Sequence, residues 1–136
     1  MTFGEFKPFL EDIAIGDRKI PNDITLSIFI SQSMKRLAVD TKPLTLLSND
    51  IRDEVLFVTK DGYFIRVPNV VKDESDVLDM DDDLILALAY LVASHFGHSD
   101  NYNKYMNLYY GQTNIYNWGR YETSQNLCNE NEEEQC

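Results

Sequence analysis

Hydrophobic residues in the first part of the chain recur at three- and four-residue intervals, which is the spacing of one face of an α-helix. The clearest run lies between Ile24 and Ala38. Asn22 and Asp23 precede it, and their short side chains can cap the unpaired amides of a first helical turn. The sequence therefore predicts an amphipathic helix over this run, with a buried stripe of Leu26, Ile30, Met34 and Leu37.

The segments on either side of this helix have weaker patterns. From Phe3 to Ile15, aromatic and acidic residues alternate around Pro8, and we expect an extended arm or a short helix. Gly16 ends that segment. The stretch from Asp40 to Asn49 contains a proline and polar breaks, so we interpret it as a connection whose leucines still pack.

A change to β-branched and aromatic residues predicts strands near the middle of the chain. The runs Val55–Lys60 and Tyr63–Pro68 are separated only by Asp61 and Gly62. This dipeptide favours the two-residue type I′ turn that matches the twist of paired strands. We therefore predict a β-hairpin over residues 55–68.

The pattern returns to helical spacing in the last third of the chain. Leu84 to Phe96 is apolar on nearly all sides, which is typical of a buried helix. Three aspartates precede it, and carboxylates at that end are favoured by the helix dipole. After Gly97, a second helix is predicted from Asn101 to Tyr121, and the short link between the two helices favours an antiparallel pair.

Together these elements predict a mainly α fold with a small β-hairpin, a helical bundle that includes the C-terminal antiparallel helix pair. The chain has 136 residues, the size of one domain. We place a single helical domain at residues 1–122, with the hairpin inserted. Residues 123–136 have little apolar content and form an acidic polar tail, either flexible or docked on a partner.

Charge narrows the possible functions. The net charge is −11. Proteins that bind nucleic-acid phosphates need clustered Lys and Arg, so this charge argues against nucleic-acid binding. The acids concentrate in the runs Asp73–Asp83 and Glu130–Glu134. The two cysteines lie in the tail and form no disulfide framework, and the chain starts without a basic and apolar leader. These features favour a reducing, cytosolic setting without a membrane.

The sequence lacks the usual motifs of metal and catalytic sites. Counting from Asp79, a calcium loop would need Gly at its sixth position and Glu at its twelfth, but the chain has Leu84 and Tyr90 there. His95 and His98 lack the HExxH pattern. The sequence also lacks GxSxG, GxGxxG and GxxxxGK[ST] motifs. We expect no enzyme activity, no cofactor and no metal.

Aromatic residues are the remaining signal for function. They gather on the last predicted helix, directly before the tail, and aromatic side chains are favoured both in cores and at protein interfaces. Both interpretations stay open for these residues, because one face of the helix can pack in the core while the other contacts a partner. The candidate partner-interface residues are Tyr109, Tyr110, Tyr116, Trp118 and Tyr121.

The last two predicted helices, DDDLILALAYLVASHFG and NKYMNLYYGQTNIYNWGRYE, resemble the head-to-tail adaptor, or connector, proteins of tailed bacteriophages. An aromatic-rich stretch before a C-terminal tail is common to that family, and the inserted hairpin is compatible with it. The resemblance covers Asp81 to Glu122. It implies a helical core, a closed ring of about twelve copies, and docking of the C-terminal segment, here Trp118 to Cys136, onto the portal protein.

The resemblance implies a structural virion protein at the head–tail junction, assembled in the host cytoplasm, that joins the portal to a tail-side ring or tail proteins and lets DNA pass. An acidic channel wall would repel phosphates and let the duplex slide. The candidate channel-facing acids are Asp79, Asp81, Asp82 and Asp83. Two alternatives remain: a small acidic regulator that binds a host protein, and a metal-dependent enzyme using His95 and His98.

Overall fold

The computed structural model describes the backbone of residues 1–131 and the side chains of residues 1–120. This part of the chain is mainly helical and carries a small antiparallel sheet, which confirms the predicted fold class. The α-helices are α1 (Phe3–Ile13), α2 (Asp23–Thr41), α3 (Ile85–Phe96) and α4 (Tyr102–Asn131). The strands are β1 (Leu47–Ser48), β2 (Val55–Val58) and β3 (Phe64–Arg66), and short 3-10 turns occur at η1 (Leu44–Leu46), η2 (Asp82–Leu84) and η3 (Ser99–Asn101).

Helix α1 resolves the two alternatives predicted for the N-terminal segment in favour of a helix. Its start is fixed by a capping box, in which the Thr2 hydroxyl accepts from the amide of Glu5 and the Glu5 carboxylate accepts from the amide of Thr2. Phe3, Phe6 and Leu10 recur at helical spacing and are all fully buried. Burial of this stripe outweighs the single hydrogen bond that a proline inside the helix cannot donate.

Helix α2 confirms the predicted amphipathic helix and continues to Thr41. Asn22 accepts a hydrogen bond from the amide of Thr25, as expected for a helix cap. The helix ends where Lys42 adopts the left-handed conformation, with φ of 49°. The predicted stripe is fully buried: Leu26, Ile30, Met34 and Leu37.

The predicted hairpin is present, but the predicted type I′ turn is wrong. The amide of Thr59 bonds the carbonyl of Tyr63, so three residues rather than two lie between the last paired positions. Gly62 alone among them has a positive φ, of 90°. This is a type I turn followed by a left-handed glycine, an arrangement also compatible with strand twist.

A third strand, β1, falls within the segment predicted as a connection. It pairs with β3, which therefore lies between β1 and β2, with Leu47 opposite Ile65. Two residues give too little alternation for a strand to be recognised from its pattern. Ile65 is the residue of this sheet that is fully buried and joins the core.

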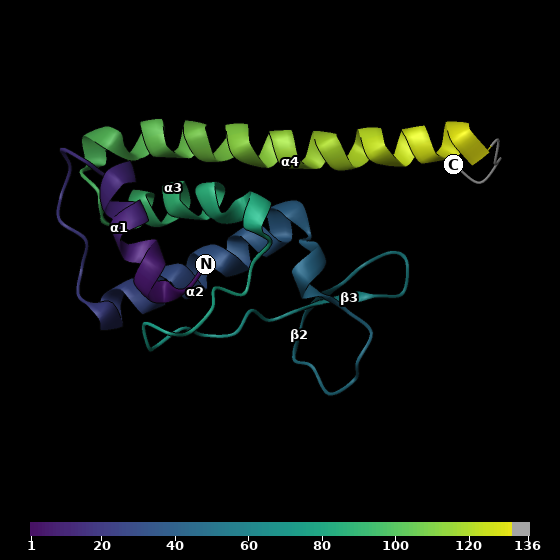
Figure 1. The fold of residues 1–136 in the computed structure, drawn as a ribbon, viewed down its shortest axis with the longest axis horizontal. Helices are drawn as coiled ribbons and strands as arrows, with labels where there is room; N and C mark the ends of the chain where they lie inside the picture. The colour runs from purple at the N-terminus through teal and green to yellow at the C-terminus, as the bar shows by residue number, and fades with distance from the viewer. Residues whose placement is uncertain (132–136) are drawn as a thin grey trace.

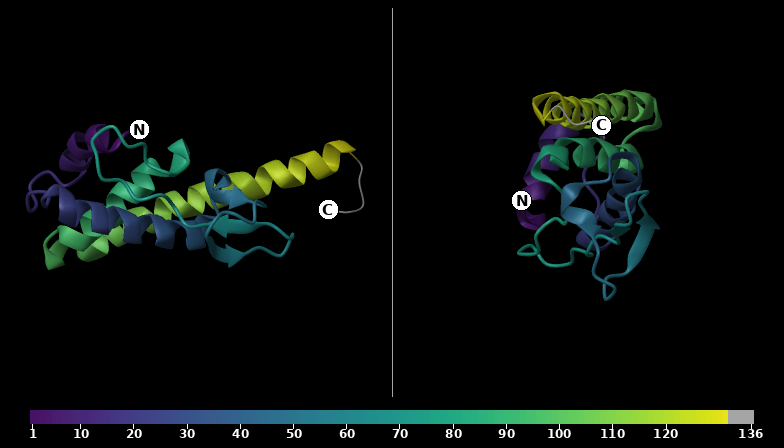
Figure 2. Two further views of the ribbon diagram at one scale, coloured as in Figure 1. Left: turned by 90° about the horizontal axis from the view of Figure 1, so that it is seen from below. Right: turned by 90° about the vertical axis from the view of Figure 1, so that its right-hand side faces the viewer.

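Helix α3 lies at the centre of the bundle and contacts α1, α2 and α4. Figure 1 shows α3 between α2 and α4, with α4 running antiparallel along it, and the sheet beyond the end of α2. The views in Figure 2 agree on the antiparallel α3–α4 pair. A helix covered by three others must be apolar on nearly all sides, as the sequence of α3 is.

Helix α4 extends beyond the end predicted at Tyr121, because a helix that is already nucleated can propagate through polar residues at little cost. Figure 1 shows its C-terminal part projecting past the bundle. The predicted tail begins at residue 123, so the backbone is helical over its first part, to Asn131. Residues 132–136 lie outside the described residues, and a flexible or partner-docked tail stays a prediction.

Candidate protein-interaction surface

Helix α4 has two faces with different environments. The inner face lies on the bundle, and its buried residues follow the three- and four-residue spacing seen in the sequence. The outer face points away from the bundle (Figures 1 and 2). The buried residues of the inner face are Tyr105, Met106, Tyr109 and Thr113.

Three tyrosines of the inner face each donate their hydroxyl to a carboxylate of another segment. The pairs are Tyr105 with Asp17 (2.8 Å), Tyr109 with Asp40 (2.6 Å) and Tyr116 with Asp81 (2.8 Å). The three acids belong to the α1–α2 loop, to α2 and to the segment before η2, respectively. Hydrogen bonds to a charged acceptor are among the stronger ones in proteins, so α4 is held at three levels along its length.

The environment keeps these hydroxyl groups protonated. Burial raises the pKa of Tyr105 and of Tyr116 to about 12, and the neighbouring carboxylate adds to the effect at each position. The pKa of Tyr109, the most deeply buried of the three, is raised further for the same two reasons. The hydroxyls therefore remain donors at any physiological pH.

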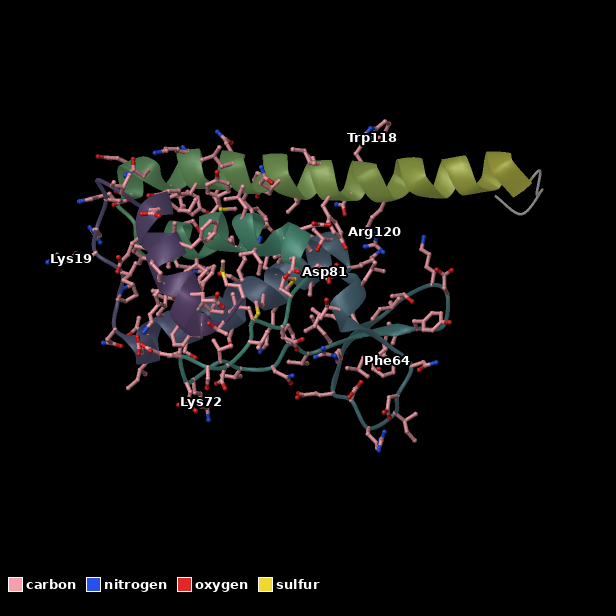
Figure 3. The ribbon with its side chains drawn as sticks, viewed as in Figure 1. Lys19, Phe64, Lys72, Asp81, Trp118 and Arg120 are labelled. Carbon is pink, nitrogen blue, oxygen red and sulfur yellow. The ribbon has the colours of Figure 1, made fainter. Side chains whose placement is uncertain are left out.

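Arg120 adds a fourth attachment, near the end of α2. Its guanidinium donates to the backbone carbonyls of Thr41 and Lys42, each at 2.6 Å. Carbonyls at a helix C-terminus lack partners within the helix, so a basic side chain there stabilises it. Figure 3 shows Arg120 and Trp118 on opposite sides of α4, with Arg120 toward the bundle and Trp118 away from it.

Over residues 102–120, the outer face of α4 carries exposed large apolar side chains and no acids. Leu108, Ile115 and Trp118 are 39%, 67% and 60% exposed. Between Asp100 and Glu122 the sequence contains no Asp or Glu, although the whole chain carries 23 of them. Exposed large apolar side chains along one helix are typical of a surface that another protein covers.

The structure places the predicted partner-interface residues in three different environments. Tyr109 is fully buried within the chain, and Tyr116 is half-buried. Tyr110 is exposed and accepts a hydrogen bond of 2.9 Å from the Arg36 guanidinium, and Trp118 is exposed. The fifth residue, Tyr121, lies outside the residues whose side chains are described.

Leu108 and Ile115 belong to the exposed face, but sequence reasoning did not place them among the interface candidates. The predicted interface residues were mostly tyrosines, and several of these tyrosines lie on the inner face. The available signal was the second helical spacing, from Leu108 through Ile115 to Trp118, which shares one face of the helix. Aromatic content alone cannot separate the two faces, because tyrosine suits both environments.

The four predicted channel-facing acids divide into two internal and two exposed residues. Asp79 forms a two-point ion pair with Arg66 and accepts from the amide of Asn69 at 2.8 Å. Its side chain is only 9% exposed. Asp82 and Asp83 are exposed at the start of η2.

Asp81, the second internal acid, joins three segments. Besides the Tyr116 hydroxyl, its carboxylate accepts from the amides of Leu44 (3.0 Å) and Thr45 (2.8 Å). Burial would raise the pKa of Asp81, but these hydrogen bonds outweigh it and hold the pKa below its usual value. Asp79 and Asp81 therefore both connect neighbouring segments of the same chain.

The two histidines considered as metal ligands have separate surroundings. The His95 ring stacks on Phe29 with 5.2 Å between ring centroids, and burial together with Arg36 lowers its pKa. The amide of His98 donates to Asp17 at 2.8 Å. Within residues 1–120, no three His, Cys, Asp or Glu side chains gather as a metal site would require.

No protein-family profile, curated protein or solved structure matches this chain. No helix in the described part of the chain is long and apolar enough to cross a membrane.

Proposed function

We propose that this chain is a structural virion protein of a tailed bacteriophage, without catalytic activity, that forms a ring joining the portal to the tail. The resemblance to the adaptor family implies about twelve copies. Repeated head-to-tail contacts form a closed ring when the rotation per subunit divides a full turn. One observation carries the proposal: a rigidly attached α4 presents Leu108, Ile115 and Trp118 to the outside.

The attachment of α4 supports an assembly role because it reduces the cost of binding. The Tyr–Asp hydrogen bonds and Arg120 hold the helix before any partner arrives. A surface that is already ordered loses little conformational entropy on association. Trp is also among the residue types enriched at the positions that contribute most of the energy of an interface.

The distribution of charge supports the same role. A chain with a net charge of −11 repels its own copies over most of its surface. The acid-free stretch of α4 lets another subunit approach without bringing carboxylates together. In the ring, this face would contact a neighbouring subunit or the portal protein, and the segment from Trp118 to Cys136 would dock on the portal.

Among the predicted channel-facing acids, Asp82 and Asp83 are the two available for this role, because Asp79 and Asp81 are engaged within the chain. Exposed carboxylates on the inner wall would repel DNA phosphates, so the duplex would slide without binding. We expect D82N/D83N subunits to assemble normally and to slow DNA release. Unchanged release would remove these acids from the channel.

The direct test is assembly on the portal. The chain is co-produced with the portal protein encoded in the same genome, and the purified complex is examined by native mass spectrometry and negative-stain electron microscopy. The proposal predicts a ring of about twelve copies on one face of the portal. A chain that stays monomeric and does not bind the portal would contradict it, and would favour the small acidic regulator instead.

A further inference from the structure

The outer face of α4 carries a heptad seam. Positions 104, 108, 111, 115, 118 and 122 follow one another at intervals of four, three, four, three and four residues. This alternation keeps a row of side chains on one line of a helix and is the spacing of a coiled-coil contact. The described members of the seam are Lys104, Leu108, Gly111, Ile115 and Trp118.

The seam faces away from the bundle. Leu108, Ile115 and Trp118 are exposed, and a Cβ atom added at Gly111 would meet no atom within 4 Å. The space beside Gly111 is therefore available for a side chain from another molecule. Gly111 makes a gap in the row, and Ile115 makes a protrusion one turn later.

The spacing of the seam reads the same in both directions along the helix. Its intervals are symmetric about position 113, which equates Leu108 with Trp118 and Gly111 with Ile115. An antiparallel pair of identical helices therefore places Gly111 of one copy against Ile115 of the other, and Leu108 against Trp118.

A parallel pair would place each residue against its own copy. Trp118 would meet Trp118, the two Gly111 positions would leave an unfilled gap, and Lys104 would approach Lys104. Overpacking, cavities and like charges all oppose that arrangement. For a pair of identical chains, the sequence of the seam thus favours the antiparallel orientation.

We propose that the outer seam of α4 binds a second copy of this chain as an antiparallel coiled coil with a two-fold axis at the level of residue 113. This inference goes beyond the ring function and does not depend on it. A contact between single helices is small compared with the ~1,200 Å² or more of most stable interfaces, so we expect a weak, reversible pair. In free subunits the pair covers the apolar face that a larger assembly would use.

Cross-linking tests the orientation. Cys128 and Cys136 are replaced by Ser, and Leu108→Cys and Trp118→Cys are introduced into separate chains. These positions lie about 15 Å apart along one helix. A short bis-maleimide is expected to join a mixture of the two variants several-fold more than either variant alone. Stronger linkage of each variant to itself, or equal low linkage in all three samples, would overturn the proposal.

Gly111→Leu tests the fit. The substitution adds apolar surface to the exposed face and has room within the chain. A nonspecific apolar contact would become stronger, whereas an antiparallel seam would lose the space that receives Ile115. Light scattering over a concentration series is expected to show at least tenfold weaker dimerisation for Gly111→Leu than for the unmodified chain. Equal or stronger dimerisation would overturn the proposal.

The antiparallel pairing of α4 and the ring can be tested separately. Both seam tests use the isolated chain, whereas the ring test requires the portal protein. A chain that pairs through α4 and never forms a ring would contradict only the ring. A chain that forms the ring and shows neither pairing result would contradict only the seam.

Discussion

The phenol oxygen of Tyr109 in α4 lies 2.6 Å from a carboxylate oxygen of Asp40 in α2. Tyr109 is fully buried, and the Arg36 guanidinium lies 5.5 Å from the centre of its ring. Arg36 is also 3.7 Å from the same carboxylate. One tyrosine thus sets the distance between α4 and the helix beneath it, and indirectly the orientation of the outer face.

We expect Tyr109→Phe to lower the free energy of unfolding by about 1.5–3 kcal/mol, the usual loss for a hydrogen bond to a charged group. The ring remains to fill the core, so no cavity adds to the loss. Urea denaturation followed by circular dichroism measures it.

Tyr110→Phe is the matched control, because Tyr110 is exposed and bonds Arg36 at the surface. Its expected loss is below about 0.5 kcal/mol, as for most surface substitutions. Equal losses for the two variants would contradict the special position of Tyr109.

Asp17 makes the stability of the fold depend on pH in the acidic range. Its carboxylate accepts from the His98 amide, the Tyr105 hydroxyl and the Asn101 side chain. Burial would raise the pKa of Asp17, but these hydrogen bonds outweigh it and hold the pKa well below its usual value. Because the folded-state pKa lies below that of the unfolded chain, the stabilisation is present at neutral pH and is lost as pH falls below about 4.

We expect Asp17→Asn to be less stable than the unmodified chain at pH 7, by roughly 2 kcal/mol, because an amide is a weaker acceptor for these donors. The difference should shrink as the pH is lowered from 4 toward 2. Thermal unfolding across this range measures it, with the exposed Asp12→Asn as control. A constant difference at every pH would contradict the assignment.

Substitution of glycine by alanine is expected to have opposite effects at Gly97 and at Gly111. A Cβ at Gly97 would lie 2.6 Å from the Asp17 carboxylate and 2.9 Å from the Tyr105 ring, so Gly97→Ala must displace that pair. We expect a loss of about 1–3 kcal/mol, typical of overpacking.

At Gly111 the added methyl group meets nothing within 4 Å, and alanine is the better helix former. Gly111→Ala should therefore gain roughly 0.8–1 kcal/mol. Chemical denaturation of both variants tests the pair, and a loss at both positions would show that Gly111 is enclosed.

Much of the fold follows from spacing in the sequence. The stripe of α2 and the all-round apolar character of α3 each identified a helix, because both patterns extend over several turns. The hairpin followed from two β-branched runs around a glycine. The turn type did not follow, since Gly62 suits a three-residue loop as well as a two-residue one.

The roles of single acids could not be predicted. Asp79 and Asp82 stand three residues apart in one acidic run, yet the first pairs with Arg66 and the second is exposed. The difference depends on where β3 places Arg66, which is a tertiary relationship. Likewise, Tyr109 and Tyr110 are neighbours in sequence, and only the orientation of α4 on the bundle buries one and exposes the other.

The central claim is that the outer face of α4 carries the contacts of this chain with other proteins, its own copies included. Sedimentation velocity of Ile115→Asp against Asn114→Asp tests it most directly. Both variants add one negative charge at neighbouring exposed positions, but only residue 115 lies on the seam. The account predicts that Ile115→Asp stays monomeric at concentrations where Asn114→Asp and the unmodified chain associate. Identical sedimentation of all three proteins would contradict it.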